Sequence, residues 1–223
     1  MINILLIDVK YIVLNNKLDL NYKMEITFIR HGFSEHNLDM LLETCNNEYS
    51  NLTKGGIDHC YKVRSNLPEF DVVVTSSLLR ALQTTKILFE GKMLKIYVTN
   101  ACRTLGHIQN KRITNCEIEK LYPEYDMTYM SCDFDENDIT SKIIALDILI
   151  KDLNEMGYKK LAVVSHSSFI TKYLNIDMAY INYCETWEHN LSPTTPTGGN
   201  NSPFKPPLNP LQQGVKGELF PPH

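Results

Sequence analysis

The sequence lacks several features that would assign it quickly to a class of protein. Its 223 residues include no apolar run that approaches the roughly 20 residues of a membrane-spanning helix. Its six cysteines are scattered and form no C-x-x-C pair, which argues against a zinc site or a disulfide framework and favours reduced thiols. The formal net charge is only −4, so we expect no general attraction to nucleic acid or to an anionic membrane.

The N-terminal stretch also lacks the pattern of a signal peptide. Asp8 and Lys10 interrupt its apolar run, no basic region precedes the run, and no small-residue cleavage site follows it. We therefore expect a cytoplasmic protein in which residues 1–23 form an N-terminal extension.

What the sequence does contain is an alternation of short apolar strands with amphipathic helical segments. Strand-like runs cover residues 25–29, 70–77 and 94–100, and a fourth begins at residue 160. Apolar residues recur at helical spacing over residues 52–67, 78–91 and 138–156. This alternation predicts an α/β sheet, with a domain that spans residues 24–191.

The composition changes after the predicted domain. Residues 192–223 are rich in Pro, Gly, Asn and Ser and have no apolar period, so we expect a disordered tail. The stretch "PFKPPLNP" within it leaves open a second possibility, that the tail binds a partner domain as an extended polyproline segment.

Three predicted strands end in side chains that suit an anionic ligand. These are Arg30 and His31 after the first strand, Arg80 one turn beyond the second, and His166 and Ser167 after the last. Because the carboxyl ends of parallel strands meet at one edge of a sheet, we expect one pocket there. Guanidinium groups and the free N–H groups of a helix start both bind phosphoryl oxygens, so the pocket fits a dianionic phosphoryl group.

The same pocket has the groups needed for phosphoryl transfer. A neutral imidazole is nucleophilic near pH 7, so His31 can attack phosphorus. Two guanidiniums and a protonated His166 would then stabilise the charge on the phosphoryl oxygens. A single histidine beside a strand is more often structural, but two histidines at the ends of separate strands favour a functional role.

Four stretches carry a resemblance to a known family: "RHGFSEHN", "LTKGGIDH", "VVVTSSLLRALQTT" and "LAVVSHSSFI". In order and spacing they resemble the signature blocks of the histidine phosphatase superfamily, in its phosphoglycerate mutase-like branch, over roughly residues 25–185. The resemblance implies that His31 is the phosphorylated nucleophile and His166 the second histidine of the pocket. It also implies that Arg30, Asn37 and Arg80 contact the phosphate.

The resemblance implies a fold as well. Members have a three-layer α/β sandwich in which a mixed, mostly parallel sheet carries helices on both faces. The phosphatase reaction of the family uses no metal or organic cofactor. We therefore expect neither in this protein.

One part of the family pattern is missing. The branch normally supplies an acidic residue soon after the position of Arg103, where this chain has "TLG". That acid protonates the leaving oxygen, and general acid–base assistance is typically worth about 10²–10⁴ in rate. The next carboxylates along the chain are Glu117 and Glu119, and His107 is an alternative proton donor.

The sequence thus predicts a phosphatase that hydrolyses a phosphomonoester, either a phosphorylated small molecule or a phosphoprotein, with no nucleic acid or membrane partner. The missing acid keeps a second class open, a non-catalytic module that recognises phosphate. A phosphoglycerate mutase-type phosphotransferase is the less favoured third reading, because the segment over residues 100–135 is short for a closed mutase pocket.

Overall fold

The computed structural model of the chain describes residues 24–37, 49–104, 113–130 and 138–176. The predicted N-terminal extension and the predicted disordered tail lie outside these residues, so both remain predictions. The domain boundaries at residues 24 and 191 likewise remain predictions.

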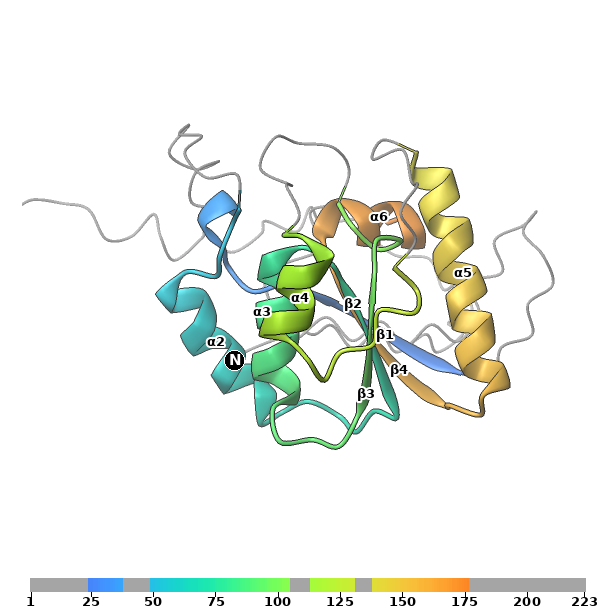
Figure 1. Cartoon of the computed structure of the whole chain (residues 1–223), viewed down its shortest axis with the longest axis horizontal. Helices are drawn as coiled ribbons and strands as arrows, with labels where there is room; N and C mark the ends of the chain where they lie inside the picture. The colour runs from blue at the N-terminus through green and yellow to red at the C-terminus, as the bar shows by residue number, and fades with distance from the viewer. Residues whose placement is uncertain (1–23, 38–48, 105–112, 131–137, 177–223) are drawn as a thin grey trace, which may run out of the picture. The chain divides into compact units, whose positions relative to one another are not determined.

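Four parallel strands form the centre of the described structure (Figure 1). They are β1 (Glu25–Arg30), β2 (Val72–Ser76), β3 (Lys95–Thr99) and β4 (Lys160–Ser165), in the spatial order β1-β4-β2-β3. Their β-branched and apolar residues are buried almost throughout, as expected for a parallel sheet covered on both faces. The expected strands are confirmed, each to within a few residues.

Helices cover both faces of this sheet (Figure 1). On one face, α2 (Lys54–Arg64), α3 (Leu79–Phe89) and α4 (Asn115–Leu121) pack on strand residues such as Ile29, Val73 and Val164. On the other face, α5 (Ile139–Glu155) and α6 (Ser167–Leu174) pack on the alternate strand residues, including Phe28, Val74 and Val163. Alternate side chains of each strand thus enter two separate hydrophobic cores, one on each face of the sheet. The three-layer α/β sandwich is confirmed.

Local signals in the sequence fix where the helices begin and end. The hydroxyl of Thr53 accepts the N–H of Gly56 at the start of α2, and the carboxylate of Asp138 accepts two N–H groups at the start of α5. Gly91 and Gly157 follow α3 and α5 with positive φ angles of 76° and 98°, which glycine adopts without steric cost.

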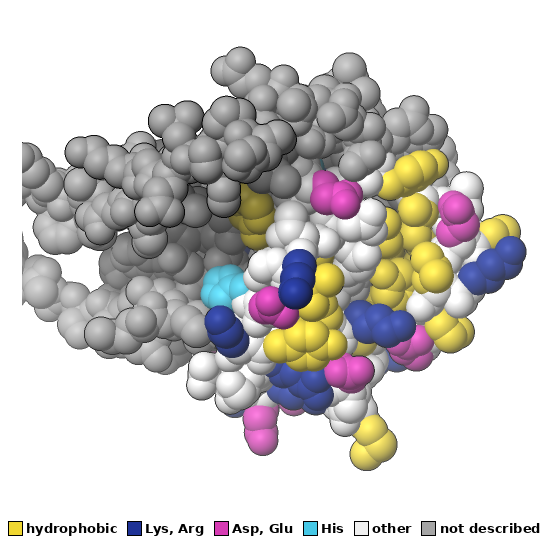
Figure 2. Space-filling view, turned by 90° about the vertical axis from the view of Figure 1, so that its left-hand side faces the viewer, with side chains coloured by type: hydrophobic (Ala, Val, Ile, Leu, Met, Phe, Trp, Pro, Cys, Tyr) yellow, Lys and Arg dark blue, Asp and Glu magenta, His cyan; other side chains and the backbone are white. Residues whose placement is uncertain are grey.

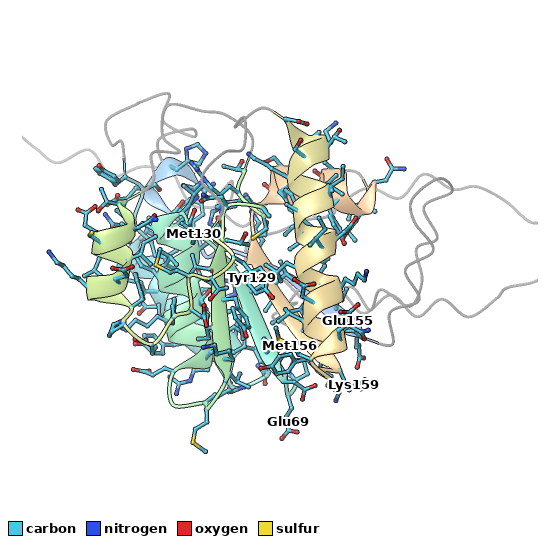
Figure 3. The ribbon with its side chains drawn as sticks, turned by 45° about the vertical axis from the view of Figure 1, so that its right-hand side comes forward. Glu69, Tyr129, Met130, Glu155, Met156 and Lys159 are labelled. Atoms are coloured by element: carbon cyan, nitrogen blue, oxygen red, sulfur yellow. The ribbon has the colours of Figure 1, made fainter. Side chains whose placement is uncertain are left out.

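The topology places the two ends of the sheet in different surroundings. Glu155, Met156 and Lys159 lie beside the amino end of β4, at the lower end of the molecule in Figure 3. The carboxyl ends of all four strands lie at the opposite edge, where α6 and the start of α3 also lie.

The described surface carries mixed side chains on the side where α2 lies. Figure 2 shows acidic, basic and hydrophobic side chains interspersed there. Within the described ranges, no helix combines the length and the apolar character needed to cross a bilayer.

Candidate active site

His31 follows the last residue of β1 and is held by its backbone and its ring. Its N–H donates to the carbonyl of Ser165 at 2.9 Å, which extends the pairing of β1 with β4 by one residue. The ring is 3% exposed, and its Nδ1 lies 2.8 Å from the carbonyl oxygen of Gly32. Because a carbonyl can only accept, Nδ1 carries the proton and Nε2 keeps its lone pair.

Arg80 lies against that lone pair. Its Nε donates to Nε2 of His31 at 3.3 Å, from the first turn of α3. Thr84, one turn further along α3, receives the N–H of Gly32 at 3.0 Å and donates to the carbonyl of Arg80 at 2.7 Å. Helix α3 therefore positions both the guanidinium and the loop that carries the imidazole.

His166 stands opposite His31, as the sequence predicted from the strand ends. It follows β4 and is the N-cap residue of α6, and the centroids of the two imidazole rings are 4.9 Å apart. Its Nε2 lies 2.8 Å from the hydroxyl of Ser76 at the end of β2. Its buried Nδ1 has no hydrogen-bond partner among the described residues.

The surroundings lower the pKa of both imidazoles well below the ordinary value. Burial is the main cause, and the neighbouring guanidinium of Arg80 is the next. Both rings are therefore neutral near pH 7 in the ligand-free protein. A neutral ring suits His31 as a nucleophile, and burial together with the guanidinium charges keeps His166 neutral while the pocket is empty. The protonated His166 that we expect concerns the ligand-bound state, and it remains a prediction.

The guanidiniums remain charged at neutral pH. Burial, followed by the charges of Arg103 and Arg30, lowers the pKa of Arg80 to about 10. Arg30 ends β1 beside Ser165 and is half-buried. The predicted pair of guanidiniums thus lies with the two histidines at one edge of the sheet.

Ser167 directly follows His166, whereas the contacts of Asn37 are within its own turn. The buried side-chain oxygen of Asn37 accepts the N–H and the hydroxyl of Ser34 at 3.1 and 2.8 Å, so this oxygen supports its own turn. The expected contact of Asn37 with a phosphate remains a prediction. Ser167 begins α6, where backbone N–H groups have no intrahelical acceptor.

Arg103 is a neighbour that the sequence reasoning missed. It follows β3 and is 8% exposed, and its charge contributes to the lowered pKa values of Arg80 and His166. The local sequence does not give this placement, because it depends on the order of strands, in which β3 ends at the same edge as β1, β2 and β4. No short motif surrounds Arg103, so only the topology identifies it.

Thr104 is the one described residue of the stretch "TLG", where an acid was expected. Thr104, directly after Arg103, has its Oγ1 2.6 Å from Oγ of Ser168 in α6. The carboxylate of Glu117 forms a capping box with Thr114 at the start of α4, and Glu119 is exposed. His107 lies outside the described residues.

The position of α2 depends on one close approach to the loop after His31. A Cβ on Gly56 would collide with the carbonyl oxygen of Phe33, so only glycine fits there. The "GG" of the second motif therefore lets α2 pack directly on the loop of the first motif.

The electrostatics of the site favour an anion over a cation. The buried charged side chains among the described residues are the cations Arg80, Arg103 and Lys142. In the same residues, no group of three or more His, Cys, Asp or Glu side chains is arranged to hold a metal ion. The expectation of no metal or cofactor remains a prediction.

Comparison with known proteins places these features in a family. The model of the histidine phosphatase superfamily (branch 1) matches residues 26–195. The 2,3-bisphosphoglycerate-dependent phosphoglycerate mutases of Actinobacillus pleuropneumoniae serotype 5b (strain L20) and Pasteurella multocida (strain Pm70) are each 41% identical over 71 residues. Those matches cover 30% of this chain and 30% of each mutase.

A solved structure is similar over more of the chain. The ecdysone phosphate phosphatase of Bombix mori, solved in complex with tungstate, is similar with a TM-score of 0.51 and 15% sequence identity. The similarity covers 82% of this chain and 85% of that one. At this identity the comparison supports the fold alone.

Proposed function

The chain belongs to the histidine phosphatase superfamily, and we propose that it is a phosphatase that hydrolyses a phosphomonoester through a phosphohistidine intermediate on His31. Members of the superfamily are phosphatases or phosphotransferases. The finer assignment rests on the chemistry of the candidate site.

One observation carries the proposal: His31 is a buried, neutral imidazole whose Nε2 lone pair faces a guanidinium. A hydrogen bond to Gly32 fixes the tautomer, and a lowered pKa keeps the ring unprotonated at neutral pH. A phosphate recognition module needs the guanidinium but has no use for a nucleophile beside it. The arrangement therefore favours catalysis over binding alone.

The proposed reaction has two displacements. Nε2 of His31 attacks phosphorus, the bond from phosphorus to the ester oxygen breaks, and Arg30 and Arg80 stabilise the charge on the phosphoryl oxygens. The ester oxygen leaves as an alkoxide or phenoxide that takes a proton from solvent. Water then attacks phosphorus and gives up a proton to solvent, the bond to Nε2 breaks, and inorganic phosphate leaves. A dianionic ligand also offsets the repulsion at His166, so its ring becomes easier to protonate while substrate is bound.

The experiment compares wild type with His31→Ala, and with Lys159→Gln as a control at the far end of the sheet (Figure 3). Phosphate release from p-nitrophenyl phosphate is measured, and the phosphoenzyme is trapped by rapid acid quench with labelled substrate. We expect turnover and label in wild type and in the control, and neither in His31→Ala.

The leaving group provides a further check on the hydroxyl pair at Thr104. Without a carboxylic acid there, an alkyl phosphate should be hydrolysed more slowly than an aryl phosphate by on the order of 10²-fold or more. Equal rates for the two substrates would mean that another residue supplies the proton.

Two outcomes would replace the proposal. The 71-residue similarity to the mutases gives one alternative, and interconversion of phosphoglycerate isomers without free phosphate would establish it. Binding of inorganic phosphate with no turnover of any aryl phosphate would establish the other, a module that recognises phosphate.

A further inference from the structure

Residues 102–104 run beside the segment that carries His166. The hydroxyl of Ser165 donates to the carbonyl of Cys102 at 2.7 Å, and the hydroxyls of Thr104 and Ser168 are 2.6 Å apart. Along the chain, Arg103 lies between Cys102 and Thr104, and His166 lies between Ser165 and Ser168. The two residues are therefore held next to each other at the carboxyl edge of the sheet.

Thr104 is also held from a second helix. Lys142, in the first turn of α5, donates from Nζ to the carbonyl oxygen of Thr104 at 3.2 Å. This lysine is only 2% exposed, and burial of an ammonium group is costly unless it makes a specific interaction. Helices α5 and α6 thus fix the carbonyl and the hydroxyl of one residue, the neighbour of Arg103.

Arg103 is placed where its charge acts on the pocket. Its side chain is 8% exposed and acts electrostatically on both Arg80 and His166, from the strand end on the other side of β2. Burying a guanidinium beside a second one costs free energy in the empty site. A dianionic phosphoryl group between them offsets that cost.

We infer that Arg103 is a third phosphoryl-binding guanidinium of the site, and that Lys142 and Ser168 position it through Thr104. The identity of the ligand as a phosphoryl group rests on the proposed function. The guanidinium itself and the contacts that hold it come from the structure of this chain.

The first test measures the affinity for inorganic phosphate by isothermal titration calorimetry at constant ionic strength. Arg103→Gln should weaken binding on the order of 10- to 100-fold, as expected for the loss of hydrogen bonds to a charged group. Arg103→Lys should restore part of the loss, and Lys159→Gln, which removes a charge at the opposite end of the sheet, should bind as wild type does.

The second test separates positioning from structural support by a double-mutant cycle. Thr104→Val removes the hydroxyl but keeps the carbonyl that Lys142 contacts, and should weaken phosphate binding roughly 2- to 10-fold. In the Arg103→Gln background the same change should have no further effect, because the guanidinium it positions is gone. Lys142→Met should likewise weaken phosphate binding in the wild-type background and have no further effect in the Arg103→Gln background. Circular dichroism checks that each variant is folded.

The outcomes are distinct from those for the phosphatase assignment. If wild type binds phosphate but turns over no substrate, the proposed function fails. The phosphate affinities of the Arg103 variants then still test this inference. Wild-type phosphate affinity in folded Arg103→Gln overturns the inference while the phosphatase remains. Additive losses in the cycle overturn the positioning roles of Lys142 and Ser168, and a wild-type protein that binds no phosphate overturns the inference entirely.

Discussion

Thr84 is the residue through which α3 holds the loop that carries His31 in position. Its single hydroxyl receives the N–H of Gly32, next to His31, and donates to the carbonyl of Arg80. Thr84→Val keeps the shape but leaves the buried N–H without its acceptor, which costs about 1–3 kcal/mol of unfolding free energy. We expect kcat/KM on an aryl phosphate to fall on the order of 10-fold or more, because the imidazole is no longer fixed relative to the guanidinium.

Thr84→Ser is the matched control for that substitution, because it keeps the hydroxyl and removes only a methyl group. It should retain most of the activity and stability, measured by steady-state kinetics and urea unfolding. A Thr84→Val enzyme as active as wild type would show that the loop is held in place by other contacts.

The lowered pKa values of His31 and His166 make stability depend on pH. The unfolded imidazoles take up protons as the pH falls through their ordinary pKa near 6.5, whereas the native ones do so only at much lower pH. The unfolded state then binds more protons, so the free energy of unfolding should fall as the pH is lowered from 7. Urea unfolding from pH 7.5 to 5 measures this slope.

His166→Gln tests the origin of that slope. The variant removes one of the two buried imidazoles, so its unfolding free energy should depend less steeply on pH over the same range. Identical slopes in wild type and variant would show that the buried histidines are not its source.

The sequence identified most site residues because each follows a strand within a recognisable motif. His31, Arg80 and His166 were assigned in this way, and the structure brings them together. Arg103 was missed because its role depends on the order of strands and on hydrogen bonds to distant residues, which the local sequence does not encode. The neutral state of His166 in the empty pocket could not be read from the sequence for a related reason, since burial and the number of nearby guanidiniums appear only in three dimensions.

Helix α2 contains two adjacent glycines, one of which has space for a larger side chain while the other has none. A Cβ on Gly56 would collide with the carbonyl of Phe33, whereas a Cβ on Gly55 would have its nearest neighbour 4.0 Å away, at Oγ1 of Thr53. Gly55→Ala should therefore stabilise the protein by up to about 1 kcal/mol, the gain in helix propensity. Gly56→Ala should destabilise it by more than that and reduce activity, because α2 must move away from the loop after His31.

Thermal unfolding and kinetics of the two variants test this difference directly. Each variant adds one methyl group to the same helix, so each serves as the other's control. Equal effects on stability would show that the close approach of α2 to Phe33 does not constrain the fold.

Helix α4 is an element that the spacing of apolar residues does not predict. The sequence analysis did not predict this helix, because its seven residues include a single buried apolar side chain, Ile118. A different signal was present: Thr114 followed three residues later by Glu117, the spacing of a capping box, which the structure contains. The longer α3 and α5 were predicted because they bury a full apolar face.

For the whole molecule, ligand binding and stability should be linked through the site. An anion that binds only the native state stabilises it by RT ln(1 + [L]/Kd), about 2.7 kcal/mol at 100 times Kd. Inorganic phosphate should therefore raise Tm in a concentration-dependent manner, and should raise it much less in Arg80→Met. Sodium chloride at matched ionic strength is the control, and an equal rise with chloride would argue against a specific phosphate site.

The pairing of β1 with β4 has a consequence for how the protein is made. Among the described strands, β4 alone pairs with β1, so the first of these four to be synthesised cannot enter the sheet before the last of them. A nascent chain halted before residue 160 would expose one edge of β1 and the facing edge of β2, and pairings so distant in sequence form slowly. Such truncated chains should be catalytically inert and should depend on chaperones, because the strand that carries the nucleophile has no pairing partner in the sheet until β4 has been synthesised.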